Sequence, residues 1–139
     1  SYARERSVRL ALENGAMDVL QAVTDAFPAR APGDPGSCLG ICIDVGHANL
    51  HRDLFANPAA AYLRAFADRL IHLHVSDNSG AGDEHLVPGT GNIDWRSVAA
   101  ALRRIPFRGN TVLELAEAGP ADAARRAAGF LGTVGLGAG

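Results

Sequence analysis

The sequence predicts an α/β fold in which four strand-helix units form half of a (β/α)8 barrel. Short aliphatic strands alternate with amphipathic helices, a pattern that is typical of βαβ units and a parallel sheet. In each strand the aliphatic residues share one face, and an acidic residue or a histidine lies on the other face near the carboxyl end. The wall of such a barrel has this two-sided character. The 139 residues bound the chain to one partial barrel domain, residues 1–139.

The first unit consists of a strand over residues 7–13 and a helix over residues 16–27. The strand carries Glu13 on its polar face, and Asn14-Gly15 interrupts it. The helix is predicted from apolar residues that recur on one side: Met17, Leu20, Val23 and Phe27. A connector rich in proline and glycine follows over residues 28–37.

The second and third units repeat this pattern. A strand over residues 39–45 carries Asp44 on its polar face. The helix after it spans residues 57–68 and begins with an Asn-Pro pair, which is typical of a helix start. The third strand, over residues 70–76, carries His74 on its polar face, because imidazoles alternate there with aliphatic residues.

A long loop and the fourth unit complete the chain. The loop after the third strand is crowded with acids, amides and a histidine: Asp77, Asn78, Asp83, Glu84 and His85. Loops of this length are often functional. Asp94 caps the next helix, which ends at Pro106. A strand over residues 110–116 carries Glu114, and a last helix begins at Gly119-Pro120 and continues to about residue 131.

Composition excludes several classes of protein. The formal net charge is −2 and no basic stripe is present, so a nucleic-acid partner is not favoured. All thirteen basic residues are arginine, so this chain cannot supply a Schiff-base lysine. No long apolar run and no signal-peptide pattern is present, so we expect a soluble, cytoplasmic protein with no membrane partner. The start at Ser1, in a charged segment close to a strand, is typical of a fragment.

The two cysteines are predicted to be reduced thiols. Cys38 and Cys42 lie four residues apart on one strand. At ~3.3 Å per residue this spacing separates their Cα atoms by roughly 13 Å. A disulfide requires less than about 7 Å. A zinc ribbon is not favoured, because no second cysteine pair exists.

Four sequence motifs resemble those of a known family. They are CIDVGHA at 42–48, HLHVSDN at 72–78, DEHLVPGTGNIDW at 83–95 and VLELAE at 112–117. Their spacing resembles that of the xylose-isomerase-like TIM barrels, the sugar-phosphate isomerase/epimerase superfamily, which is related to endonuclease IV. The resemblance covers essentially the whole chain. It implies that the chain supplies strands five to eight, the C-terminal half of the barrel.

The resemblance also implies a divalent metal ion at the strand ends. The implied ligands come from four strands: Glu13, Asp44, His74 and Glu114. Three carboxylates and one imidazole suit Mn²⁺, Mg²⁺ or Co²⁺ better than a structural Zn²⁺, although Zn²⁺ also fits. From the residues alone, Glu13 and Glu114 could instead be ion-pair partners inside a barrel. We expect His72, one step deeper than His74, to pack or to support a ligand.

Residues around this metal site are expected to contact the substrate. The resemblance places His47 at the substrate or at a second metal ion. In the endonuclease branch, residues like His47, Asp83 and His85 hold an additional zinc. We expect Asp83 and His85 to bind substrate or metal, and Asn78 to donate a hydrogen bond to a polyol. Without the resemblance, His47 could equally be a satisfied loop histidine.

These residues favour a metal-dependent isomerase or epimerase that acts on a sugar or sugar phosphate. Glu13 and Glu114 would form the acid/base pair, one removing a proton next to a metal-bound carbonyl and the other returning one. The alternatives are an endonuclease IV-like metal-dependent phosphodiesterase, a dehydratase acting on a cyclic polyol, and a non-catalytic half-barrel fragment. The chain is expected to associate with an N-terminal half-barrel or with itself. The sequence leaves open which sugar is bound and which carbon is inverted.

Overall fold

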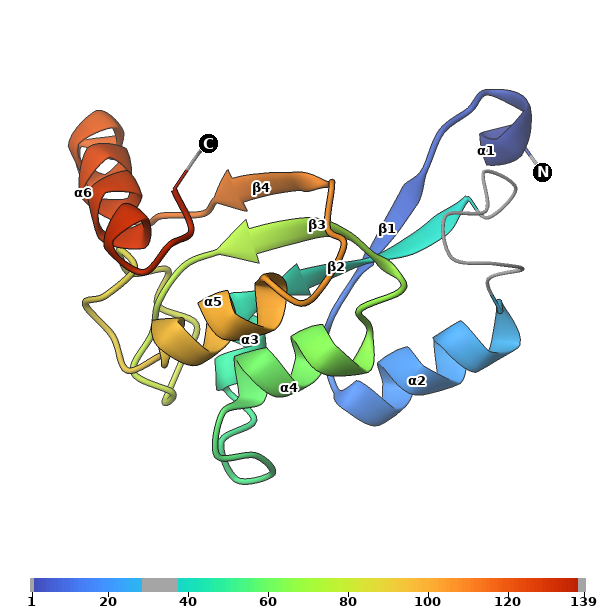
Figure 1. Cartoon of the computed structure of the whole chain (residues 1–139), viewed down its shortest axis with the longest axis horizontal. Helices are drawn as coiled ribbons and strands as arrows, with labels where there is room; N and C mark the ends of the chain where they lie inside the picture. The colour runs from blue at the N-terminus through green and yellow to red at the C-terminus, as the bar shows by residue number, and fades with distance from the viewer. Residues whose placement is uncertain (1, 29–37, 138–139) are drawn as a thin grey trace.

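The computed structural model describes residues 2–28 and 38–137, and within them four parallel strands form one sheet (Figure 1). The strands neighbour one another in chain order: β1 (Leu10–Glu13), β2 (Leu39–Asp44), β3 (Leu70–Val75) and β4 (Asn110–Leu113). Each neighbouring pair is parallel. The carboxyl ends of all four strands therefore lie at the same edge of the sheet.

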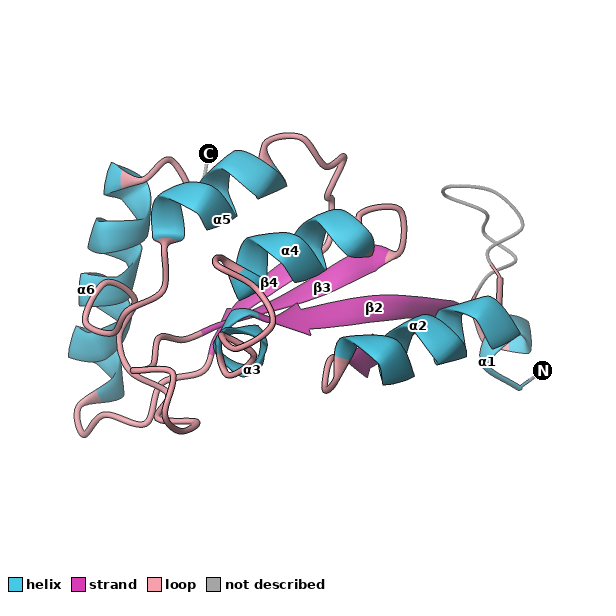
Figure 2. Ribbon diagram, turned by 90° about the horizontal axis from the view of Figure 1, so that it is seen from below, coloured by secondary structure: helices cyan, strands magenta, loops and turns pink. Residues whose placement is uncertain are grey.

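The described residues also form six helices: α1 (Tyr2–Glu5), α2 (Met17–Ala26), α3 (Val45–Asn49), α4 (Pro58–Ala65), α5 (Trp95–Leu102) and α6 (Pro120–Thr133). Helices α2, α4 and α5 cover one face of the sheet, which Figure 2 shows from below. Helix α6 lies beside α5, where the Phe130 ring stands edge-on to Trp95 with 6.4 Å between centroids. No described helix covers the opposite face of the sheet. None of the helices in these ranges is long and apolar enough to span a membrane.

The hydrophobic core lies between the sheet and its covering helices. Ile41 and Ile43 of β2 are fully buried. Tyr62 and Leu63 of α4 and Val98 of α5 belong to the same core cluster. Fully burying an aliphatic side chain of this size contributes about 1.5–3 kcal/mol of transfer free energy. In β2, the alternation of residues correctly predicted which face meets the helices.

The predicted α/β class and its four strand-helix units are confirmed, but β1 is shorter than predicted. It begins at Leu10, because the residues before it fold back onto α1. Ser7 adopts a left-handed φ of 55°, and the Val8 N–H donates a 2.9 Å hydrogen bond to the Ala3 carbonyl. Most of the predicted connector, residues 29–37, lies outside the described residues.

The short helix α3 was not predicted. The strand expected over residues 39–45 ends at Asp44, and Val45 begins the helix instead. The Asp44 carboxylate caps this helix by accepting a 2.8 Å hydrogen bond from the His47 backbone N–H. A helix of five residues is too short to display an apolar period, so no pattern in the sequence indicated it.

The remaining boundaries differ by a few residues. The predicted cap of α5 is confirmed, since Asp94 accepts a 3.1 Å hydrogen bond from the Ser97 N–H. Asn57 occupies the cap position of α4, but its side chain makes no capping hydrogen bond, and the helix ends at Ala65. The fourth strand ends at residue 113, three residues before its predicted end. Such shifts of one to three residues are ordinary for helix and strand ends.

Neither cysteine forms a disulfide bond with another described residue, as predicted. Burial, helped by the negative charges of Glu13 and Asp44, raises the pKa of the Cys42 thiol to about 12. The thiol is therefore protonated at neutral pH when no cation is bound to it.

The sheet has two edges among the described residues, because β1 and β4 each pair with a single strand. Leu10 on β1 is 51% exposed and Val112 on β4 is 40% exposed. Edge strands present unpaired backbone N–H and C=O groups, and exposed apolar edges pair readily with other strands. A sheet of this kind favours association with a second half-barrel.

We expect the 139 residues to self-associate when they are produced alone, because edge pairing buries these exposed groups. Light scattering should report species larger than a monomer. Leu10→Lys should reduce the association, because a charge on an edge strand opposes pairing. Val19→Lys, at a 61% exposed position on α2, is the matched control. A stable monomer that melts cooperatively would contradict this expectation.

Candidate active site

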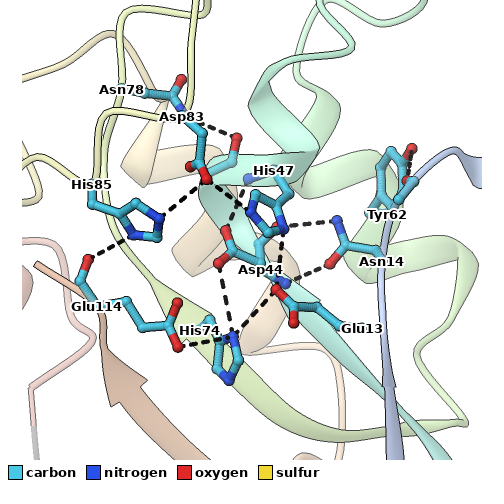
Figure 3. A network of polar contacts seen from close by, with 12 residues as sticks. Glu13, Asn14, Asp44, His47, Tyr62, His74, Asn78, Asp83, His85 and Glu114 are labelled. Carbon is cyan, nitrogen blue, oxygen red and sulfur yellow. Dashed lines mark hydrogen bonds and ion pairs between the residues drawn. The ribbon is translucent and has the colours of Figure 1, made fainter.

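The four predicted metal ligands meet at the carboxyl edge of the sheet (Figure 3). Glu13 ends β1, Asp44 ends β2, His74 lies one residue before the end of β3, and Glu114 directly follows β4. Parallel pairing sets Asp44 opposite His74. The fold thus brings together all four residues that the sequence pattern placed at strand ends.

The Nδ1 atom of His74 lies at the centre of this cluster. It is 3.5 Å from Glu13 Oε1, 3.4 Å from Glu114 Oε1 and 3.8 Å from Asp44 Oδ2. Asp44 is fully buried, whereas the side chains of Glu13 and Glu114 are 40% and 35% exposed. The cluster is therefore anchored at its buried side and open on the side of the two glutamates.

Two atoms of the cluster fit the binding of a cation. His74 Nδ1 and Asp44 Oδ2 are buried and have no hydrogen-bond partner among the described residues. Such atoms are rare in folded proteins, and each one requires an explanation. Two ligands of one ion with bonds of about 2.1 Å lie roughly 3.0–3.4 Å apart. The separations around His74 Nδ1 are close to this range. Glu13, Asp44 and His74 form a compact group of ligand atoms that fits a divalent metal ion, and Glu114 adjoins this group through His74.

Asn14 holds the buried residue Asp44 in place. Its side-chain oxygen accepts a 2.5 Å hydrogen bond from the Asp44 backbone N–H, and its Nδ2 donates to the Asp44 carbonyl at 3.2 Å. Asn14 is 3% exposed and follows Glu13 directly. The sequence had suggested only that Asn14 ends a strand. No local pattern distinguishes this side-chain clamp from an ordinary turn asparagine.

A second group of ligand-type residues adjoins the first. His47 Nε2 and His85 Nε2 each lie 3.1 Å from Asp83 Oδ2. The His85 Nδ1 lies 3.2 Å from the Glu114 carbonyl oxygen, so the ring is held between that carbonyl and the Asp83 carboxylate. These three residues form a compact group of ligand atoms.

His47 links the two groups, because both of its ring nitrogens face carboxylates. Nδ1 lies 3.1 Å from Glu13 Oε1, and Nε2 faces Asp83. Burial of the ring lowers the pKa of His47, but the negative charges of Asp44, Asp83 and Glu13 together outweigh burial and raise it. In the absence of a bound cation, the imidazolium form therefore persists to a higher pH than in an exposed histidine.

The loop that carries Asp83 and His85 is organised by Asp77, a residue without a predicted role. Asp77 is fully buried. Its carboxylate accepts 2.8 Å hydrogen bonds from the Trp95 indole N–H and the Gly89 N–H, and a 3.2 Å bond from the Ile93 N–H. A charged acceptor with several donors fixes a loop strongly. Only the tertiary structure reveals these donors, since they lie 12–18 residues away.

Asn78, the predicted contact to a polyol, is enclosed within the protein. Its side chain is fully buried. Its oxygen accepts hydrogen bonds from Asn49 Nδ2 at 2.8 Å and from the Gly80 N–H at 3.0 Å, and its Nδ2 donates to the Gly46 carbonyl at 2.8 Å. Since these bonds use the amide within the protein, the geometry favours a structural role over the predicted polyol contact.

The fold agrees with comparisons to known proteins. The family model described as xylose isomerase-like TIM barrel matches residues 1–134. An uncharacterized protein of Sinorhizobium fredii is 32% identical over 112 residues, covering 78% of this chain and 33% of that protein. Fructoselysine 3-epimerase of Shigella flexneri is 33% identical over 60 residues, covering 43% of this chain and 22% of the enzyme. A solved structure of a D-tagatose 3-epimerase-like protein matches with a TM-score of 0.70 and 28% identity, over 95% of this chain and 48% of that one.

The chain spans about a third of the length of the Sinorhizobium relative and about half of the epimerase-like structure. Its parallel sheet, with helices on one face, therefore corresponds to half of a (β/α)8 barrel, as predicted. Its assignment to strands five to eight stays a prediction. The match over residues 1–134 is consistent with the resemblance in its motifs, and the chain belongs to the xylose isomerase-like TIM barrel family.

Proposed function

We propose that the protein is a divalent-metal-dependent epimerase or isomerase that acts on a ketose or a ketose derivative. The observation that carries the proposal is the pair of carboxylates, Glu13 and Glu114, which face His74 Nδ1 from two sides (Figure 3). The similarity to a fructoselysine 3-epimerase and to a D-tagatose 3-epimerase-like structure supports this reaction class. Both names favour carbon 3 as the reacting centre.

The metal ion would be held by the four strand-end residues: Glu13, Asp44, His74 and Glu114. Mn²⁺, Mg²⁺ and Co²⁺ suit this oxygen-rich donor set better than ions that prefer sulfur. When bound, the ion would polarise the substrate carbonyl and stabilise negative charge beside it. The unpartnered, buried atoms of Asp44 and His74 support this assignment.

Glu13 and Glu114 would move the proton. One carboxylate would remove the hydrogen from the carbon beside the carbonyl, and the other would return a proton to the opposite face, which inverts the configuration. Glu13 ends β1 and Glu114 follows β4, so the two carboxylates come from the two edge strands. Their partial exposure leaves both accessible to a substrate that enters from the open side of the cluster.

His47, Asp83 and His85 would orient the substrate next to this pair. A ring N–H of His47 would donate to a substrate hydroxyl or carbonyl oxygen. The Asp83 carboxylate would accept from a sugar hydroxyl. Asp77 would act indirectly, by fixing the loop between β3 and α5 that carries Asp83 and His85.

A metal-dependent phosphodiesterase is the second candidate, because His47, Asp83 and His85 also suit a second cation. Such an enzyme must bind a polyanionic duplex, which requires basic surface. The net charge of −2 and the absence of a basic stripe in the sequence oppose this candidate. An assay on a duplex with an abasic site separates the two candidates directly.

The central prediction concerns solvent exchange. The intact protein with its metal should exchange a substrate C–H next to the carbonyl with solvent deuterium, as mass spectrometry of a ketose panel in D₂O would show. Glu114→Gln keeps the size of the side chain and one oxygen but removes its basicity. Since positioned proton transfer contributes about 10²–10⁴-fold, exchange should fall by at least roughly 100-fold while some metal stays bound.

Two results would count against this assignment. No deuterium incorporation by the intact protein across the panel would remove the main support for an isomerase or epimerase. Incorporation that Glu114→Gln leaves unchanged would keep the reaction class but overturn the choice of base. A phosphodiesterase or an inert half-barrel would show no exchange at all.

Metal binding should depend on His74 and not on His51. His74→Ala removes the imidazole at the centre of the cluster, whereas His51 stacks on Tyr62, with 5.7 Å between centroids, and takes no part in the cluster. Calorimetric titration of the intact protein with Mn²⁺ should show weaker binding by His74→Ala but not by His51→Ala. Equal affinities for the two variants would refute the assignment of the ligands.

Asn14 should support Mn²⁺ affinity without touching the ion. Losing a group that orients a ligand typically lowers metal affinity about 10–100-fold, so we expect Asn14→Ala to weaken Mn²⁺ binding by this factor in the same titration. Asn110→Ala, at an exposed asparagine where β4 begins, is the matched control. Unchanged affinity in a folded Asn14→Ala protein would show that the clamp does not position Asp44.

A further inference from the structure

A third group of ligand-type side chains lies below the proposed active site, on β2 and β3. Cys42, His72 and His74 offer a thiol and two imidazoles whose ligand atoms lie within 4.8 Å of one another. Cys42 and His72 are direct partners in the parallel register. His72 and His74 are two residues apart and therefore point to the same face of β3.

The backbone holds these three residues in a fixed arrangement. All of them lie on adjacent, hydrogen-bonded strands, so their Cα positions are set by the sheet and only side-chain torsions remain to adjust. The two imidazole rings stand edge-on, with 5.1 Å between centroids. Cys42 is 2% exposed, so its sulfur is held among its neighbours and not in open solvent. The pairing of β2 with β3 shifts by one residue between Ile41 and Cys42 and continues in step from Cys42 to Asp44. Sites on strands hold ligands more rigidly than sites on loops.

The donor set differs in kind from that of the first site. The first site offers three carboxylates and one imidazole, which suit hard ions such as Mn²⁺ and Mg²⁺. The third group offers one sulfur and two nitrogens, a set that suits Zn²⁺ and similar thiophilic ions. Three protein ligands and one open position are sufficient for a tetrahedral zinc site.

We propose that Cys42, His72 and His74 form a second metal site, selective for thiophilic divalent ions, that shares His74 with the active-site cluster. On binding, the Cys42 thiol releases its proton to solvent and a sulfur–metal bond forms. Glu13 is the register partner of Cys42, and Asp44 lies two residues further along β2, so both place negative charge close to the site, which favours the approach of a cation.

Because His74 belongs to both sites, an ion bound by Cys42, His72 and His74 affects the metal site at the strand ends. A neutral imidazole offers one lone pair to a metal, so a thiophilic ion that takes the lone pair of His74 leaves none for the hard ion, which then binds less tightly. Thiophilic ions would therefore inhibit the protein without entering the oxygen-rich site. This consequence rests on the proposed function, whereas the binding of the thiophilic ion does not.

Cadmium is the probe for the test, because it is thiophilic and its thiolate complexes absorb in the ultraviolet. Titration of the intact, metal-free protein with Cd²⁺ should produce a thiolate charge-transfer absorption that saturates with one ion per chain. Cys42→Ser should abolish the absorption, and His72→Ala should weaken Cd²⁺ binding at least about tenfold, since even ligand-supporting groups contribute that much. Cys38→Ser, which removes the other thiol, should leave the absorption unchanged.

Absorption that survives Cys42→Ser, or that Cys38→Ser removes, would overturn the proposal, as would unchanged Cd²⁺ affinity in His72→Ala. A circular dichroism melt identifies any variant that fails to fold. If Cys42→Ser or His72→Ala fails to fold, the remaining one of these two variants tests the proposal. Competition between Cd²⁺ and Mn²⁺ distinguishes the site formed by Cys42, His72 and His74 from the metal site at the strand ends. Cd²⁺ should lower Mn²⁺ affinity in the wild type but not in Cys42→Ser. If Mn²⁺ does not bind at all, yet the cadmium absorption still depends on Cys42, the proposed function fails and the thiophilic site stands.

Discussion

The arrangement of the site depends on one buried carboxylate, that of Asp44. The backbone N–H and carbonyl of Asp44 are hydrogen-bonded to the side-chain amide of Asn14, which links the ends of β1 and β2. The Oδ1 of Asp44 caps α3 and so sets the position of His47. Its Oδ2 is left without a partner among the described residues and faces His74 Nδ1. Burying a carboxylate oxygen that accepts no hydrogen bond is costly, since the negative charge needs compensation. A cation at the strand ends would supply that partner, so the fold and the proposed chemistry share one requirement.

Strand periodicity accounts for the features that could be predicted from the sequence. A period of two residues indicates which face of a strand a side chain occupies, so the pattern placed Glu13, Asp44, His74 and Glu114 on the polar face, close to the carboxyl ends of their strands. The same pattern anticipated the buried Ile41 and Ile43 of β2. The resemblance in the motifs then suggested the chemical identity of the cluster. These predictions succeeded for one reason: residues at equivalent positions of neighbouring parallel strands lie side by side in the sheet.

The loop between β3 and α5 shows why other features escaped prediction. Asp77 and Asn78 are adjacent and polar, and both are fully buried. Asp77 gathers donors from residues more than ten positions away, and Asn78 is bonded to α3 and its own loop. Neither role has a local signature, so a polar residue near a site is easily mistaken for a substrate contact. The clamp made by Asn14 escaped prediction for the same reason.

All four proposed ligands, which include both proposed acid/base residues, lie between Glu13 and Glu114, on strands that neighbour one another in chain order. The proposed chemistry is thus encoded in one continuous stretch of sequence. A recombination event that joined this stretch to a different complementary half of a barrel would retain the proposed metal and proton chemistry while exchanging the walls around the substrate. The half-barrel would then be inherited as a unit, which offers a physical route by which one reaction spreads among many sugars.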